Sequence, residues 1–111
     1  MNDTNYIGGI VKILETPRQK IIKNDIVVTK FRAQLPQVRQ TRIVHLKFLG
    51  NLAKDITNYY KVNDYILIEG YLSLRNTPIS KTTVSFSKKV EITVLKVHPF
   101  LLHYETQTNK I

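Results

Sequence analysis

Apolar and polar residues alternate with a period of two along most of this chain, a pattern typical of strands that bury one face. In the clearest stretch, residues 41–49, Val44, Leu46 and Phe48 share one face. The same alternation predicts strands at residues 6–14, 27–35, 65–75 and 82–97, the last interrupted near 87–89, with a short extended piece at 20–23.

The period changes to that of a helix after Gly50. Apolar residues recur there along one stripe over two turns, and they are Leu52, Ala53, Ile56, Tyr59 and Tyr60. Asn51 is expected to cap the start of the helix, and residues 62–64 to end it. Loops are expected at 36–40 and 76–81, each of which contains a proline.

The predicted order is therefore three strands, one short helix and two strands. This order favours an all-β fold, the five-stranded OB-fold Greek-key barrel, whose single helix lies between the third and fourth strands. A chain of 111 residues has room for one core. We expect one OB-fold domain over residues 1–100 and a short polar C-terminal tail over residues 101–111.

Composition points to a binding protein and away from an enzyme. The formal net charge of +9 favours polyanionic partners, and the chain has no cysteine. The acidic residues show no paired spacing, and His45, His98 and His103 form no ligand cluster, so we expect no catalytic residues, no metal and no cofactor. No apolar run reaches the roughly 18 residues of a membrane span, and the start of the chain lacks a signal or transit pattern. We expect neither a membrane nor a small-molecule substrate as a partner.

The positive charge is concentrated on a few predicted strands and loops. In an OB barrel the second and third strands and their loops form the nucleic-acid groove, where basic side chains contact phosphates. The cationic candidates are Lys30, Arg32, Arg39, Arg42, Lys47, Arg75 and Lys81, with His45 among them. The alternative is that these residues only solvate the outside of the barrel.

Candidates for base contact are fewer. Phe31, Phe48 and Phe86 fall on the predicted core side, and the helix tyrosines are expected to pack as well. Tyr71 is the best stacking candidate and Tyr6 a weaker one. The strand at 41–49 adds two aliphatic candidates, Ile43 and Leu49.

Several short runs resemble the bacterial and organellar single-stranded DNA-binding (SSB) family. The runs are Leu49-Gly50-Asn51-Leu52-Ala53, Tyr59 and then Ile68-Glu69-Gly70 with Leu72, and residues 50–70 align with that family without a gap. The resemblance implies an OB fold, binding of single-stranded DNA without sequence preference, and assembly into homo-oligomers, either dimers or tetramers.

The chain also departs from the family pattern. Ile43, Leu49 and Thr77 stand where family members stack bases on aromatic rings, which predicts weaker binding with a stronger salt dependence. The acidic C-terminal tail of the family is replaced by Thr108-Asn109-Lys110-Ile111. We therefore expect a divergent, tail-less relative that binds single-stranded DNA in replication or repair. Two alternatives stay open, an oligomeric OB-fold scaffold of the replication machinery and an RNA-binding OB domain.

Residue usage bears on the compartment. Ile, Lys, Asn, Tyr, Phe and Met, which have AT-rich codons, total 44 residues, against 15 for Gly, Ala, Pro and Arg. An AT-rich genome such as that of an organelle produces this skew. We expect a plastid-encoded protein of the stroma, with the bacterial cytoplasm as the alternative.

Overall fold

The computed structural model describes residues 5–36, 42–78 and 86–102, which form six strands and one α-helix. In chain order these elements are β1 (Tyr6–Ile13), β2 (Gln19–Ile22), β3 (Ile26–Leu35), β4 (Arg42–Leu49), α1 (Asn51–Tyr59), β5 (Tyr65–Pro78) and β6 (Phe86–Leu101). A single 3-10 turn, Lys23–Asp25, joins β2 to β3, and both Asn24 and Asp25 have positive φ there. Asn and Asp tolerate that conformation best among residues other than glycine, which explains a turn at this point.

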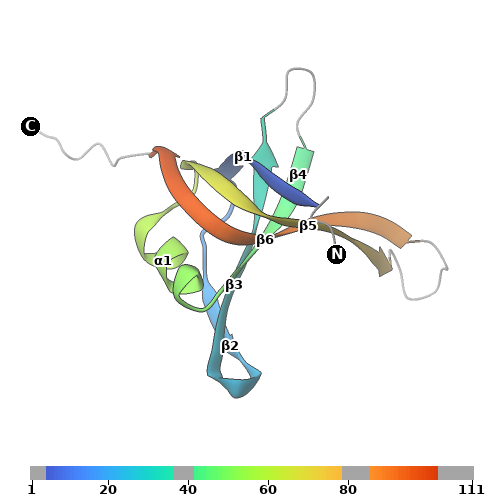
Figure 1. The fold of residues 1–111 in the computed structure, drawn as a ribbon, viewed down its shortest axis with the longest axis horizontal. Coiled ribbons are helices and arrows are strands. Elements are labelled where there is room, and N and C mark those ends of the chain that lie inside the picture. Colours follow the sequence, from blue (N-terminus) through green and yellow to red (C-terminus); the bar gives the residue numbers. More distant parts are fainter. Residues whose placement is uncertain (1–4, 37–41, 79–85, 103–111) are drawn as a thin grey trace, which may run out of the picture.

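Five of the strands close into a barrel. The sheet order is β1-β5-β6-β4-β3-β2, and an additional pairing of β1 with β3 closes the ring, leaving β2 on the outer edge of β3 (Figure 1). Only the β4–β6 contact is parallel among the described pairs. The predicted OB-fold barrel, with its helix between the third and fourth strands of the ring, is confirmed; β2 is an addition to it.

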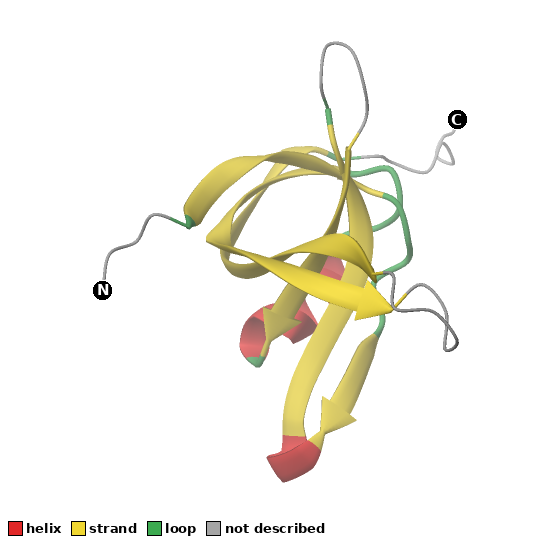
Figure 2. Ribbon diagram, turned by 90° about the vertical axis from the view of Figure 1, so that its right-hand side faces the viewer, coloured by secondary structure: helices red, strands yellow, loops and turns green. Residues whose placement is uncertain are grey.

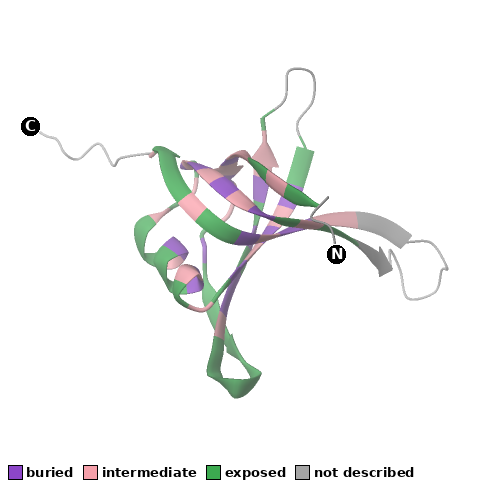
Figure 3. Ribbon diagram, in the orientation of Figure 1, coloured by how far each residue is buried: buried purple, intermediate pink, exposed green. Residues whose placement is uncertain are grey.

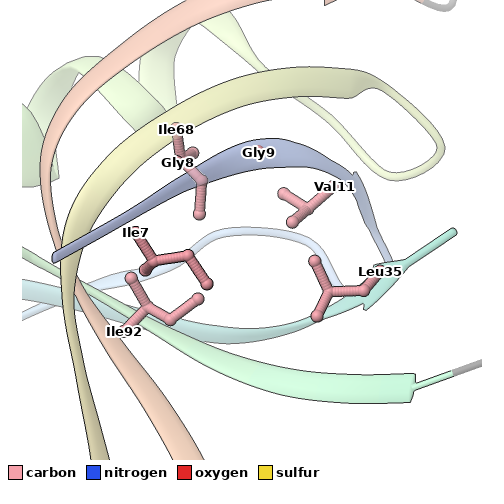
Figure 4. A pocket seen from close by; sticks show the side chains of 7 residues that line it. All are labelled: Ile7, Gly8, Gly9, Val11, Leu35, Ile68 and Ile92. Carbon is pink, nitrogen blue, oxygen red and sulfur yellow. The ribbon is translucent and has the colours of Figure 1, made fainter. Parts of the chain in front are cut away.

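Alternating residues of all five ring strands fill the interior. The core is aliphatic apart from two stacked rings, Phe31 of β3 and Phe48 of β4, whose centroids lie 5.4 Å apart. Predicted core residues Val44 and Leu46 are buried as expected. A cavity of about 20 Å³ remains beside Gly8 and Gly9 of β1 (Figure 4). It has space for about one water molecule.

The helix α1 covers one end of the barrel with Ala53 and Ile56, both fully buried. Two sequence expectations about it are wrong. The N-cap is Gly50 at φ 65°, and the expected cap, Asn51, is the first helical residue, because the sharp turn out of β4 requires a left-handed backbone. Tyr59, expected to pack, is 69% exposed, whereas its neighbour Tyr60 packs against the core.

Strands β5 and β6 run further than the alternation predicted. They stay paired out to Pro78 opposite Phe86, so part of the expected loop at 76–81 is strand, and the expected interruption at 87–89 is absent. Two register shifts occur instead, between Tyr65 and Ile66 and between Glu69 and Gly70, and a Cβ on the glycine would overlap the carbonyl oxygen of Thr93. β6 also continues through Pro99 to Leu101, one residue past the expected domain boundary.

Two hairpins therefore project from the barrel, β2–β3 and β5–β6 (Figure 2). All four residues of β2 are exposed, as is the turn that follows it (Figure 3). The β2–β3 hairpin thus extends the outer face of β3 beyond the ring.

Candidate nucleic-acid interface

The outer faces of β3 and β4 bring together basic residues that the sequence places on separate strands. Lys30 lies directly opposite Lys47, and Arg32 lies opposite His45. Like charges that face each other across a strand pair repel, so the two lysines favour an anion beside them. One anion is already near, because Lys30 Nζ lies 3.8 Å from Oε2 of the buried Glu91 on β6.

A hollow of about 340 Å³ lies between β2 and this lysine pair. Four cationic side chains surround two aliphatic ones, and the lining residues are Arg18, Lys20, Ile22, Val28, Lys30 and Lys47. Strand register explains the assembly, because Lys20 pairs with Val28 and Ile22 with Ile26 on the same outer face. Within the described residues, neither Arg18, Lys20 nor Lys47 forms an ion pair. Their charge is therefore available to an external anion.

Arg32, in contrast, has its charge largely neutralised. Its Nε donates to Glu15 Oε2 over 2.9 Å, and its backbone N–H donates to Glu15 Oε1 over 2.7 Å. These hydrogen bonds, the backbone one first, hold the pKa of the Glu15 carboxyl below its usual range, so the acid is ionised at neutral pH. The pair fastens the chain after β1 to β3, with Leu14 N–H donating to Arg32 C=O alongside. A structural contact thus occupies a residue predicted to bind phosphate.

His45 is also a weak cation. Burial, and then the charge of Lys89, lower the pKa of this imidazole, while Glu15 pulls in the opposite direction. The side chain is therefore neutral at pH 7. It can offer a hydrogen bond to nucleic acid but adds no charge to the interface.

The candidates for base contact are exposed on β4 and on β5 with β1. Ile43 and Leu49 are 45% and 43% exposed on the outer face of β4, as the aliphatic role predicted for them requires. Tyr71 is exposed on β5, and Tyr6 of β1 stands edge-to-face against it at 5.3 Å between ring centroids. The stronger and the weaker stacking candidates thus form one pair.

The remaining cationic candidates are not brought to the hollow. Arg42 is exposed, but strand alternation places it on the side of Val44, away from Lys47. Arg39 and Lys81 lie outside the described residues, and so does the side chain of Arg75, whose backbone pairs with Lys89. Their predicted phosphate contacts stay predictions.

A comparison with known proteins identifies the family. The "Putative single-stranded DNA-binding protein ycf41" of Trieres chinensis is 36% identical over 102 residues, which cover 88% of this chain and 90% of that protein. This chain belongs to the same SSB-like family. The resemblance seen in residues 49–72 is thereby confirmed. No family model matches the chain.

Solved SSB structures share the fold. The SSB domain of a Synechococcus protein superposes with a TM-score of 0.70 at 20% identity, covering 88% of this chain and 98% of that domain. The second single-stranded DNA-binding protein of Mycobacterium smegmatis gives 0.67 at 20% identity, covering 92% and 98%. The small single-stranded DNA-binding protein of Streptomyces coelicolor gives 0.70 at 16% identity, covering 91% and 97%. At such low identity the agreement concerns the OB barrel itself.

Four members of the hollow were not among the site residues predicted from the sequence, namely Arg18, Lys20, Ile22 and Val28. A signal for Lys20 existed, because residues 20–23 were expected to be extended and alternation puts Lys20 and Ile22 on one face. What the alternation does not reveal is that this piece pairs with β3. Arg18 carries no such signal, since it follows Pro17 in an irregular segment.

The described residues contain no group of three or more His, Asp or Glu side chains that could hold a metal ion. Their one α-helix, of nine residues, is too short to cross a membrane.

Proposed function

We propose that this SSB-like protein binds single-stranded DNA along the outer face of β2, β3 and β4 and performs no chemistry on it. The observation that carries the proposal is the hollow, in which four cationic side chains surround the aliphatic side chains of Ile22 and Val28. A positively charged groove that tracks the backbone is one of the two components of a single-strand site, and stacking of bases on aromatic side chains is the other. The hollow supplies the first component, and its apolar residues, Ile22 and Val28, are aliphatic. The name of the Trieres chinensis relative and the shared SSB fold support this reading.

The interface that we propose is centred on Lys30 and Lys47. Arg18 and Lys20 extend the phosphate-binding edge, while Ile22 and Val28 form its floor and Leu49 lies opposite Val28 in the register. Ile43, on the same face of β4 as Lys47, would lie toward its periphery. With few rings at the hollow, the affinity should come mainly from phosphates and depend steeply on salt.

The proposal can be tested by titrating a labelled oligo-dT of about 30 nucleotides and following fluorescence anisotropy at several salt concentrations. This length is sufficient because single-strand sites on OB folds cover roughly 4–16 nucleotides. We expect binding at low salt, with the logarithm of the affinity falling by about 0.7 per contacted phosphate for each decade of salt. Equal affinity for duplex of the same length would mean simple polycation behaviour and would contradict the proposal. The same titration with oligo-U addresses the RNA alternative.

A second candidate is an oligomeric scaffold that binds a replication protein. The exposed aliphatic side chains of Ile43 and Leu49 favour it, because apolar surface without stacking rings suits a protein partner. If the free protein sediments as an oligomer and does not bind oligo-dT, the scaffold is supported over single-stranded DNA binding. Homo-oligomers are compatible with both.

We also propose that the protein works in the plastid stroma. The excess of residues with AT-rich codons and the relationship to ycf41 support this location.

We propose further that the OB-fold domain of residues 1–100, extended to the end of β6 at Leu101, is the whole binding unit, and that the residues after it are dispensable. A chain ending at Leu102 should therefore bind oligo-dT as the full chain does.

A further inference from the structure

Tyr6 and Tyr71 form an exposed aromatic pair that the hollow does not include. The side chains are 41% and 42% exposed, and their rings meet at an interplanar angle of 73°. An edge-to-face pair holds both rings in place beyond what their burial alone provides. The pair is therefore a preformed surface of two rings, offered to solvent by two neighbouring strands.

The pair lies in the same row across the barrel as the lysines of the hollow. Lys30 is opposite Lys47, Lys47 is level with Thr93, and Thr93 is opposite Tyr71, which is opposite Tyr6. The row crosses β3, β4, β6, β5 and β1 in the order in which they neighbour one another. With strands about 4.8 Å apart, Tyr71 lies roughly 10 Å from Lys47 along the barrel surface.

The surroundings of the rings suit a base and not a phosphate. The Tyr6 hydroxyl donates to Glu69 Oε1 over 2.7 Å, and this contact, together with partial burial, raises the pKa of the phenol. The Glu69 carboxylate at the edge of the pair repels a phosphate. This surface therefore favours contact with the uncharged faces of bases. Next to Tyr71, the backbone of β6 approaches Gly70 so closely that a Cβ there would overlap the carbonyl oxygen of Thr93.

We propose that the Tyr6–Tyr71 pair is a stacking platform for unpaired bases of the strand whose phosphates are held by Lys30 and Lys47. This inference rests on the proposed function, and it adds a direction to it: the polynucleotide crosses the strands of the barrel from β3 toward β1. Phosphate binding and base stacking then occur at different ends of one row.

The experiment uses the absence of tryptophan from the chain. A Tyr71→Trp variant places a single reporter on the platform, and a Tyr59→Trp variant places a matched reporter on the exposed end of α1. Anisotropy of labelled oligo-dT measures the bound fraction separately. We expect the indole emission of Tyr71→Trp to be quenched in proportion to the bound fraction, and that of Tyr59→Trp to stay constant.

Affinity and salt dependence provide the second readout. Tyr71→Leu should weaken binding by about 5- to 100-fold, the usual value of one stacked base, without changing the salt slope, while Tyr71→Phe should bind as the unchanged protein does. Thermal unfolding verifies that both variants fold.

The outcomes are distinct. If Tyr71→Trp binds oligo-dT and its indole emission does not change, the platform is overturned and the proposed function stays intact, whereas absence of binding in the unchanged protein would overturn both. If Tyr71→Leu alters the sedimentation coefficient of the free protein and leaves its affinity for oligo-dT unchanged, the pair is a contact between copies and the inference is wrong.

Discussion

The two ends of the β3–β4 outer face look alike in sequence and differ in the structure. At one end Lys30 and Lys47 face each other next to Arg18 and Lys20, around a hollow that no acidic side chain of the described residues lines. Lys30 also lies 3.8 Å from the buried Glu91 of β6, which leaves three of these four cations without a described ion pair. At the other end Arg32 faces His45, but Glu15 partly offsets the charge of the arginine, and partial burial together with the charge of Lys89 lowers the pKa of the imidazole. In our proposal, two basic residues on adjacent strands therefore belong to the DNA-binding surface at one end, whereas at the other end Arg32 forms a structural contact with Glu15.

The difference comes from segments that precede β3 in the chain. The residues after β1 pass the Arg32 end and bring a carboxylate to it, while β2 passes the Lys30 end and brings another cation. The net charge at each end of the β3–β4 outer face therefore depends on a segment outside this strand pair. The positive potential that attracts a polyanion should be centred on the hollow and fall off toward Arg32.

The largest expected effect is on affinity at the hollow. Replacing both lysines, Lys30→Ala with Lys47→Ala, should weaken oligo-dT binding by about 30-fold at low salt, taking about 1 kcal/mol for each charge pair in water. The salt slope should fall by about 1.4, or 0.7 per lost phosphate contact. Anisotropy titrations at four or five salt concentrations measure both quantities.

Arg32→Ala is the matched control, since it removes one cation from the same strand pair. We expect its affinity to change by less than about threefold, because Glu15 already engages the Arg32 guanidinium and holds it away from a phosphate contact. A loss at Arg32 equal to that at Lys30 would abolish the distinction between the two ends.

A smaller effect, of opposite sign, should follow from releasing Arg32. Glu15→Gln removes the carboxylate charge but keeps an oxygen for the Arg32 backbone N–H, so we expect oligo-dT binding to tighten by about threefold. The free energy of unfolding should fall by no more than about 1 kcal/mol, because both side chains are partly exposed and the pair is screened. Urea denaturation measures this cost.

Asp55→Asn on α1 changes the net charge by the same amount at an exposed site that the described ion pairs do not include. If it tightens binding as much as Glu15→Gln does, the gain is a general charge effect and not the release of Arg32.

The sequence predicted the barrel well because burial imposes a period on every ring strand. Val44, Leu46 and Phe48 could be placed on the core side from alternation alone, and the change of period after Gly50 located the helix. The same alternation put Lys30 and Lys47 on the outside, and it identified Tyr71 as exposed. These are local properties of the chain.

What alternation could not supply is which outward residues meet. Glu15 reaches Arg32 across 17 positions, and Lys20 joins the hollow only because β2 folds back onto β3. The pairing of Tyr6 with Tyr71 depends on the register of β1 against β5, which no single strand encodes. The fold could therefore be predicted from the sequence, whereas the net charge of a site could be determined only from the tertiary structure.

The smallest expected effect concerns pH and distinguishes His45 from Glu15. Burial lowers the pKa of His45 in the folded protein, so below the ordinary histidine pKa of about 6.5 the unfolded chain binds more protons than the native one. The free energy of unfolding should therefore decrease as the pH falls from 7 toward 5, and His45→Gln should flatten this part of the curve.

Glu15 also has a lowered pKa, but its contribution to stability is lost only at more acidic pH, below the ordinary glutamate range. Glu15→Gln should therefore affect that part of the curve alone. Urea denaturation at half-unit steps of pH separates the two windows. If the decrease between pH 7 and 5 persists in His45→Gln, the imidazole is not the buried, neutral group that the Arg32 end of the interface requires.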